Sequence, residues 1–265
     1  MNQAFDNVAQ VYDATFTHTK IGKAQREIVW EYLEKILSEK ENLNILELNC
    51  GTGEDAIWFA KKGYKVLATD ISGKMLQATE KKVNEHHLVD KIKTEKLDLT
   101  KIEEFHSDET FDLIFSNFGG INCLAFEDFY RLPDSLSRLL NPGGRVIMVI
   151  MPTFCLWEMI YFTLKFNLKK AFRRSSTKRV KVNLNGEEIL TEYYTPILAN
   201  KIFRKEFVQA GLKPVGFFIP PSYLEYFFSS KHKIFNFIKK LELIVTNWSI
   251  LANYSDHFLI DLVRK

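Results

Sequence analysis

Residues 45–56 constrain the fold more than any other part of the chain. They begin as a short apolar segment in which Leu46 and Leu48 predict one buried face of a strand. Gly51 and Gly53 follow at once, where a backbone without side chains can approach a ligand and point amide N–H groups at it. The segment therefore predicts an α/β unit that holds a nucleotide-like group at the end of a strand.

Two polar side chains narrow the kind of nucleotide. The glycine spacing alone also fits dinucleotide-binding domains. Glu47 and Asn49, however, lie on the expected ligand side of the strand end, where a carboxylate would repel a pyrophosphate but could hold a cationic amino-acid group. The segment resembles the first motif of the class I S-adenosylmethionine-dependent methyltransferases. The resemblance implies that Glu47, Asn49, Gly51 and Gly53 contact the cofactor.

The resemblance continues in the next two elements, a predicted helix over residues 54–62 and a predicted strand over 64–72. Asp70 ends that strand at nearly the spacing, about twenty residues, of an acid that binds ribose hydroxyls. The family pattern assigns the ribose to Asp70 and places Ile71 beside it. Met75, near the start of the following helix, is the position that packs on the adenine in this family.

Later strand ends complete the pattern. Asp98 and Leu99 follow a third strand, where the family uses an aspartate for the adenine amino group, although an aspartate there is also a common helix cap. A fourth strand over 111–116 runs into the mouth of the cofactor site, the expected entrance for substrate. This loop supplies the remaining expected cofactor contacts, Asn117, Phe118 and Gly119.

The resemblance covers about residues 1–151 and implies an α/β fold. It is a Rossmann-like, doubly wound, seven-stranded sheet whose last strand is antiparallel, with an inserted helix-plus-hairpin cap after strand five. The fifth strand is predicted over 145–151. We expect a single methyltransferase domain, 1–265, in four parts: an N-terminal lid and helix (1–40), a cofactor-binding core (41–151), the cap insertion (152–200) and the C-terminal completion of the sheet (201–265).

The leader before the first strand contains a Tyr-Asp pair and a helix over 21–37. In many small-molecule methyltransferases a similar leader forms a lid. By that resemblance Tyr12 touches the methionine part of the cofactor and Arg26 pairs with its carboxylate. The alternatives are a packed core aromatic for Tyr12 and a solvated helix residue for Arg26.

The predicted cap begins with an apolar stripe at helical spacing after the fifth strand. The stripe consists of Phe154, Trp157, Ile160, Tyr161, Leu164 and Leu168. A hairpin is predicted over 180–184 and 188–194, because Asn185-Gly186 is a strong two-residue turn signal. Beyond it we expect a helix over 199–210, a strand over 213–219, an aromatic helix from Tyr223 and a final strand over 256–263. The stripe either packs on the sheet or walls a substrate pocket.

A basic run overlaps the cap. It comprises Lys165, Lys169, Lys170, Arg173, Arg174, Lys178, Arg179 and Lys181. Such a run is usually a solvated face, but beside an aromatic stripe it predicts an anionic carrier or a membrane surface as partner. The net charge of only +3 argues against a general polyanion-binding protein, so nucleic acid is not the expected partner. The oligomeric state is left open.

Composition indicates a cytoplasmic enzyme. Cys50, Cys123 and Cys155 show neither metal-ligand spacing nor even pairing, which favours a reducing compartment and no metal site. No signal-peptide pattern precedes residue 10, and the longest uncharged run, 146–157, is too short to cross a bilayer.

The predicted reaction is methylation of a small, largely apolar or aromatic molecule, most simply at oxygen or nitrogen. The sulfonium cofactor is already electrophilic, so alignment and exclusion of water matter most. His18, Tyr193, Tyr194 and His257 are the candidate general bases, and each also has a structural interpretation.

Two other functions remain open. A nucleic-acid methyltransferase could use the basic 165–181 segment, although the fourth-strand loop lacks the Asn-Pro-Pro-aromatic signature and Cys123 has no preceding proline. An NAD-dependent oxidoreductase could use the same glycine pattern, but Glu47 argues against it.

Overall fold

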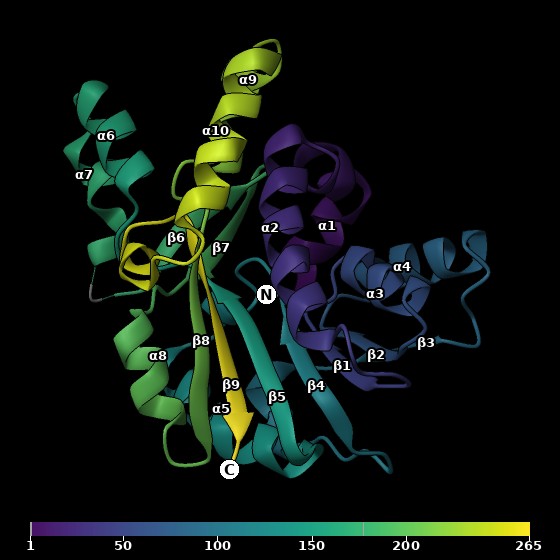
Figure 1. Ribbon diagram of the computed structural model, residues 1–265. Helices are drawn as coiled ribbons and strands as arrows, with labels where there is room; N and C mark the ends of the chain where they lie inside the picture. Colours follow the sequence, from purple (N-terminus) through teal and green to yellow (C-terminus); the bar gives the residue numbers. More distant parts are fainter. Residues whose placement is uncertain (1, 177) are drawn as a thin grey trace.

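The computed structural model describes residues 2–176 and 178–265, and its centre is a seven-stranded sheet between two helical layers (Figure 1). The strands lie in the order β3-β2-β1-β4-β5-β9-β8. Their bounds are β1 (Asn44–Leu48), β2 (Lys65–Asp70), β3 (Ile92–Lys96), β4 (Phe111–Ser116), β5 (Leu140–Ile150), β8 (Phe207–Val215) and β9 (His257–Arg264). β9 is antiparallel to both of its neighbours, whereas β1 to β5 are mutually parallel. The predicted α/β fold, a seven-stranded sheet whose last strand is antiparallel, is confirmed.

Successive side chains along a strand point to opposite faces of the sheet, so the central strands contribute to both core clusters. On β5, Ile147 and Val149 join one core cluster, and Val146 and Met148 join the other. The first cluster is covered by α2 (Lys20–Leu37), α3 (Glu54–Lys61), α4 (Gly73–Glu85) and α10 (His232–Val245). The second is covered by α5 (Phe126–Leu139) and α8 (Pro196–Phe203). Strands buried on both sides explain the continuous apolar runs in the sequence.

The N-terminal segment forms α1 (Asn2–Tyr12), which continues through a single π-helical turn, η1 (Asp13–Thr17), toward α2. Thr19 caps α2 by accepting a hydrogen bond from the Gly22 N–H at 3.0 Å. Asp6 of α1 accepts a hydrogen bond from the Ser72 hydroxyl at 2.6 Å, so the leader is fastened to the start of α4. The leader helix α1 thus lies beside the carboxyl end of β2, and the helix predicted over 21–37 is α2.

The segment after β5 contains both predicted elements. The helices are α6 (Leu156–Leu164) and α7 (Leu168–Ala171), and the hairpin is β6 (Val180–Leu184) with β7 (Glu187–Thr191). Asn185 and Gly186 both have positive φ, 51° and 96°, as the predicted two-residue turn requires. The apolar stripe is not one buried face, however. Tyr161 packs against the core, while Leu164 is 75% exposed.

Three boundaries differ from the predictions. The helix predicted over 199–210 is α8, which begins at Pro196 because Thr195 caps it and proline suits a first helical turn. β8 then begins at Phe207, and a register shift between Gln209 and Gly211 hides its alternation in the sequence. The aromatic helix near Tyr223 is divided into three pieces. They are η5 (Ser222–Leu224), α9 (Glu225–Phe228) and α10.

Short 3-10 turns complete the chain: η2 (Leu99–Glu104), η3 (Ile121–Cys123), η4 (Arg173–Ser175) and η6 (Ser249–Asn253). Among the helices in the described parts of the chain, none is long and apolar enough to cross a membrane.

A buried carboxylate secures the chain where it leaves β8. Glu242 of α10 accepts hydrogen bonds from the four consecutive backbone N–H groups of residues 216–219, at 2.6 to 3.1 Å. Burial raises the pKa of this carboxyl, and the four backbone donors oppose that rise. Glu242 therefore fixes the path from β8 to η5, which forms one side of the site described below.

We expect Glu242→Ala to lower the free energy of unfolding by about 3 kcal/mol, because it leaves four donors without their acceptor. Urea denaturation measures the change. Lys240→Ala, an exposed position on the same helix, is the matched control and should change stability by less than about 0.5 kcal/mol. Equal stability of the two variants would contradict the assigned role of Glu242.

Candidate functional site

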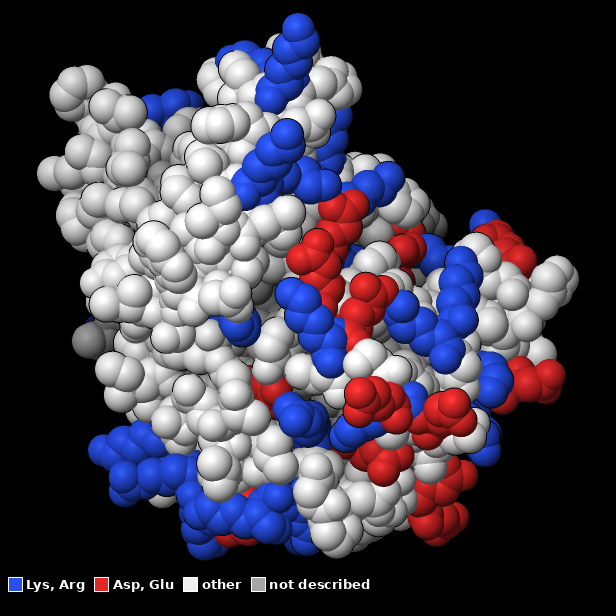
Figure 2. All heavy atoms as spheres, in the orientation of Figure 1, with Lys and Arg blue, Asp and Glu red and all other residues white. Residues whose placement is uncertain are grey.

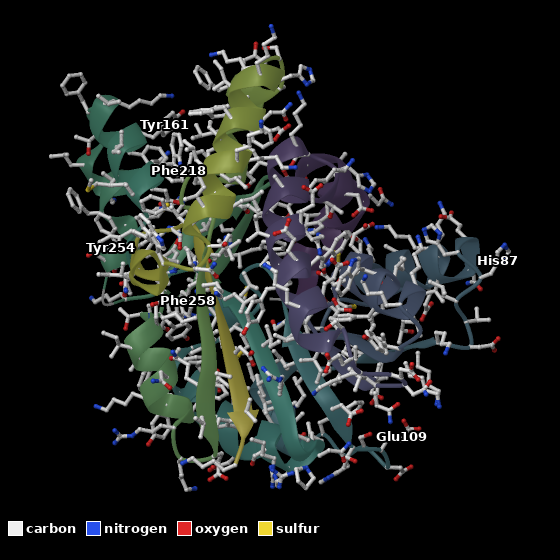
Figure 3. The ribbon with its side chains drawn as sticks, viewed as in Figure 1. His87, Glu109, Tyr161, Phe218, Tyr254 and Phe258 are labelled. Atoms are coloured by element: carbon white, nitrogen blue, oxygen red, sulfur yellow. The ribbon has the colours of Figure 1, made fainter. Side chains whose placement is uncertain are left out.

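A cavity of about 880 Å³ opens at the carboxyl ends of the parallel strands. β1 lies between β2 and β4 in the sheet, so the crossovers leaving β1 and β4 run to opposite sides and leave a crevice between them. The cavity extends from this crevice past β5 and β9 to α6 and the hairpin. Figure 3 shows Tyr161 on the side of α6 that faces α10, across this end of the molecule.

The turn after β1 is held in a conformation that glycine favours. Gly51 has φ of 56° and lines the cavity, and its N–H donates to an Asp70 carboxylate oxygen at 2.9 Å. Gly53 has φ of 81°, and a Cβ placed there would lie 2.6 Å from the Thr79 side chain. Gly53 is therefore a packing position behind the turn, whereas Gly51 and Asn49 reach the cavity.

Asp70 joins the turns that follow β1 and β2. Its carboxylate accepts a hydrogen bond from the Ser72 N–H at 2.9 Å in addition to the one from Gly51, and the residue is 8% exposed. Burial raises the pKa of Asp70 to about 6, despite these donors. A carboxylate so placed has remaining lone pairs that can accept hydrogen bonds from a ligand.

The residues that follow β2 and β3 form an apolar part of the cavity wall with an acid at its edge. Met75 is nearly fully buried at the start of α4, and Ile71 and Leu99 line the same cavity. Asp98 accepts hydrogen bonds from the Thr100 N–H at 3.0 Å and the Thr100 hydroxyl at 2.8 Å through one oxygen, which makes it the cap of η2. Asp98 also lines the cavity, so capping and ligand binding are compatible.

The loop after β4 crosses the cavity mouth. Asn117, Phe118 and Gly119 all line it, and Phe118 has an unusual φ of 44°. The Asn117 amide donates to Asp55 at 3.0 Å. Asp55 also accepts hydrogen bonds from Trp30 at 2.7 Å and from Arg26. This buried carboxylate therefore fixes the loop from behind.

Arg26 and Glu47 lie behind the described cavity lining and not on it. Arg26 is buried and ion-paired with Asp55, and with Tyr12 it lines a small side pocket under the β1 turn. Glu47 is 1% exposed, and burial raises the pKa of its carboxyl well above the usual value, which favours the neutral acid. Of the leader residues predicted to meet a cofactor, Tyr12 also reaches the main cavity.

The four candidate bases are placed very differently. His18 is exposed at the end of η1, 3.8 Å from Glu54. Tyr194 is buried and donates its hydroxyl proton to the Leu124 carbonyl at 3.0 Å, and Tyr193 lies beneath the Arg174 guanidinium. None of these three belongs to the described cavity lining. His257, at the start of β9, does belong to it.

Behind His257 is a buried charge network that the sequence did not indicate. Arg174 donates to Asp256 at 2.7 Å and to Glu158 at 2.8 Å, and Arg173 also binds Glu158. Burial alone would raise the pKa of Asp256, but His257 and Arg174 hold it well below the usual range. Two arginines of the basic run are thus turned inward, and Arg174 joins the segment after β5 to the residue that precedes β9. The adjacent Asp256-His257 pair was the available sequence signal.

The hairpin and the leader meet over the cavity. Asn7 of α1 donates to Glu187 at 2.9 Å, and Asn185 donates to the Thr15 hydroxyl at 2.8 Å. Val182 of β6 and Met151 after β5 line the cavity beneath this contact, and neither was predicted. The contact joins positions far apart in the sequence, so no local pattern could reveal it.

A possible cation position lies outside the cavity. Ligand atoms of Asp13, His18 and Glu54 lie within 4.8 Å of one another. The Lys82 ammonium pairs with Asp13 at 2.7 Å and Glu54 at 2.6 Å, so a protein cation already neutralises both carboxylates.

Comparison with known proteins gives consistent findings. Residues 45–144 match the family model of a methyltransferase domain. The demethylmenaquinone methyltransferase of Clavibacter sepedonicus is 28% identical over 145 residues, 54% of this chain and 55% of that protein. The tRNA 5-carboxymethoxyuridine methyltransferase of Escherichia coli (strain K12) is 31% identical over 84 residues, 29% of this chain and 32% of that protein. The chain spans about half the length of the first curated relatives it matches.

Among solved structures, the DhpI–SAM–HEP complex is similar with a TM-score of 0.60 at 16% identity, covering 99% of this chain and 95% of that chain. At this identity the likeness shows the fold alone.

The different surroundings of Gly53 and Gly63 allow a test of the close packing behind the β1 turn. Gly53→Ala should lower the free energy of unfolding by about 2 kcal/mol more than Gly63→Ala does. Both positions have positive φ, but a Cβ at Gly63 meets nothing within 4 Å, whereas one at Gly53 meets Thr79. Thermal or urea unfolding of both variants measures the difference, and equal losses would show that the close approach to Thr79 is unimportant.

Proposed function

We propose that this chain, which belongs to the class I S-adenosylmethionine-dependent methyltransferases, methylates an oxygen or nitrogen atom of a small, largely apolar or aromatic molecule. The observation that supports this most is the continuity of one cavity. Asp70 and Met75 line it on the β2 side of the sheet, and Tyr161 and His257 line it on the α6 and β9 side. One continuous space can therefore hold a cofactor and a second molecule together.

The residues at the β1 and β2 ends fit S-adenosylmethionine. In the proposal, Asp70 accepts hydrogen bonds from the ribose hydroxyls, Met75 and Leu99 enclose the adenine, and Asp98 accepts from its amino group. Asn49, Gly51 and Asn117 lie toward the methionine part. Ile71, Phe118, Gly119 and Tyr12 complete the enclosure. When bound, the cofactor supplies an electrophilic methyl group.

Arg26 and Glu47 support this site from behind. Arg26 neutralises Asp55, which holds Asn117, so its effect on a ligand passes through that loop. Glu47 lies under the β1 turn, and its Oε2 has no hydrogen-bond partner in the described parts of the chain. A cationic amino group near the turn would favour the ionised form of this carboxyl.

The rest of the cavity favours an apolar substrate. Its wall includes Met151, Tyr161, Phe162, Ile189 and Tyr223. A volume of about 880 Å³ lies within the usual range of small-molecule sites, about 300–1,000 Å³. Aromatic and aliphatic walls exclude water from the reacting atoms and hold a substrate by burying its apolar surface.

His257 is the proposed general base. Its Nδ1 is buried 3.3 Å from an Asp256 oxygen, off the direction of a regular hydrogen bond, which leaves Nε2 as the nitrogen that can meet a substrate. The ionised Asp256 stabilises the imidazolium that forms when His257 takes a proton. Arg174 positions Asp256, and Phe118 lies edge-on to the imidazole at 5.4 Å.

Methylation of nucleic acid is the second candidate, favoured by the partial similarity to the tRNA methyltransferase and by the basic run. The side chains of Arg173, Arg174 and Arg179, however, bind protein acceptors, and Lys181 pairs with Glu188. Four of the eight basic side chains are therefore already bound within the protein and are less available to phosphates, which favours the small-molecule proposal.

Isotope transfer separates the two candidates. Purified protein is incubated with methyl-labelled S-adenosylmethionine and either a small-molecule extract or total RNA, and labelled products are identified by mass spectrometry. The proposal predicts label in an apolar small molecule. Label confined to RNA would establish the second candidate instead.

Asp70 gives the cofactor proposal a pH signature. Ionised Asp70 accepts stronger hydrogen bonds from ribose hydroxyls than the neutral acid does, so affinity for S-adenosylmethionine should weaken as the pH falls through about 6, the pKa of Asp70. Asp70→Asn should weaken binding by about 1–3 kcal/mol near neutral pH and abolish that pH dependence. Calorimetric titration at several pH values measures both effects. An unchanged pH profile in the variant would refute the role of Asp70.

His257→Gln should reduce kcat by about 10²–10⁴-fold for a hydroxyl substrate while leaving cofactor affinity nearly unchanged. His18→Gln is the matched control, since His18 lies outside the described cavity lining. Equal activity of the two variants would remove His257 as the base.

A further inference from the structure

Two helical projections rise past the carboxyl ends of the strands, α6–α7 on one side and α9–α10 on the other (Figure 1). Their ends expose large apolar side chains to an unusual degree. Phe166 is 95% exposed, Tyr226 is 94% exposed and Leu164 is 75% exposed. Scattered exposed apolar residues are common, but several on the ends of two projections at one edge mark an interaction surface.

We name this surface the docking edge. Its apolar members are Leu164, Phe166, Leu168, Tyr226, Phe227 and Ile234, and its basic members are Lys165, Lys169, Lys170, Lys231 and Lys233.

The charge of the docking edge has one sign. Segments 154–176 and 221–248 contain three acidic residues, and each accepts hydrogen bonds from other groups of the protein. Glu158 binds two arginines, Glu242 binds backbone N–H groups, and Glu225 accepts from the N–H groups of Lys20 and Ile21 at 3.0 Å. Figure 2 shows basic side chains over the upper end of α9 and α10.

The lysines of the docking edge are available to a partner. None of the five forms an ion pair with the residues that the structure describes, and three of them, Lys165, Lys170 and Lys231, lie over aromatic rings. Lys231 is 3.2 Å from the centre of the Phe227 ring, and Lys165 is 4.5 Å from that of Tyr161. Cations beside exposed aromatic rings are the pattern of surfaces that lie in the headgroup region of a membrane.

We propose that the docking edge binds the surface of an anionic lipid bilayer. The apolar ends insert among the upper acyl chains, and the lysines attract the anionic headgroups. The projecting ends suit a soft, planar partner, because an acidic protein would satisfy the lysines but leave Phe166 and Tyr226 in water. The short helices fit a protein that lies on a bilayer.

The same edge adjoins the proposed active site. Lys165, Lys170 and Tyr223 line the large cavity, so the cavity reaches the docking edge. An apolar substrate dissolved in the bilayer would have a short route to His257. This route rests on the proposed function, whereas binding to the bilayer does not.

Co-sedimentation with vesicles tests the proposal without any activity measurement. The full chain is mixed with vesicles of phosphatidylglycerol and phosphatidylcholine, or of phosphatidylcholine alone. We expect binding to the first and weak binding to the second, with a loss of binding at high salt. Phe166→Ser with Tyr226→Ser should weaken binding by about tenfold or more, and Lys169→Gln with Lys233→Gln by about fivefold per lysine.

Matched controls lie far from the docking edge. Val89→Ser replaces an exposed apolar residue, and Lys93→Gln removes an exposed cation on β3, the opposite edge strand of the sheet. Both should bind as the wild type does, and circular dichroism verifies that all variants are folded. Absence of binding to anionic vesicles, or equal binding by all variants, would overturn the proposal. A second copy of the chain is the other possible partner. The proposal would be overturned if the wild type is a dimer, Phe166→Ser converts it to a monomer, and vesicles do not dissociate the wild-type dimer.

Discussion

The site depends on one constraint, the position of β1 between two parallel neighbours. Because β2 lies on one side of β1 and β4 on the other, the chain segments that leave β1 and β4 diverge and a crevice remains between them. The hydrogen bond from the Gly51 N–H to Asp70 ties two of these loops together at 2.9 Å. That bond places a backbone turn and a carboxylate on the same wall, where a ribose can be held.

Buried charges then fix the walls. Asp55 accepts a hydrogen bond from Asn117 and so fixes the loop after β4, and Asp256 lies 3.3 Å from the His257 imidazole. Each of these carboxylates is paired with an arginine. Removing one partner from such a buried pair typically costs about 3–5 kcal/mol, since the other charge is left unpaired. Arg174 belongs to the segment inserted after β5. Order in the cap is therefore coupled physically to the position of the proposed base.

Local patterns predicted what lies at strand ends. A glycine turn and an acid at a strand terminus act within a few positions, so local patterns predicted Gly51 and Asp70, whereas the family resemblance implied Met75 and Asp98. All four line the cavity. The hairpin was predicted for the same reason, since Asn185 and Gly186 determine its turn. Boundaries failed where tertiary contacts decide them, as at β8, whose pairing with β9 contains a register shift.

Long-range pairing explains the interactions that the sequence did not reveal. Arg26 has no local feature that reveals Asp55 as its partner, and Arg174 gives no sign in the sequence that it joins Glu158 to Asp256. The basic run therefore predicted a single basic surface. In the structure its arginines bind acceptors within the protein, whereas its lysines point to solvent. Only the fold distinguishes the two, because it decides which cations meet buried carboxylates.

The most direct test of the central claim is a crystal structure of the chain with S-adenosylhomocysteine. The proposal predicts the ribose on Asp70, the adenine between Met75 and Leu99, and the sulfur facing the part of the cavity that His257 lines. Product bound elsewhere, or a ribose that makes no contact with Asp70, would contradict it.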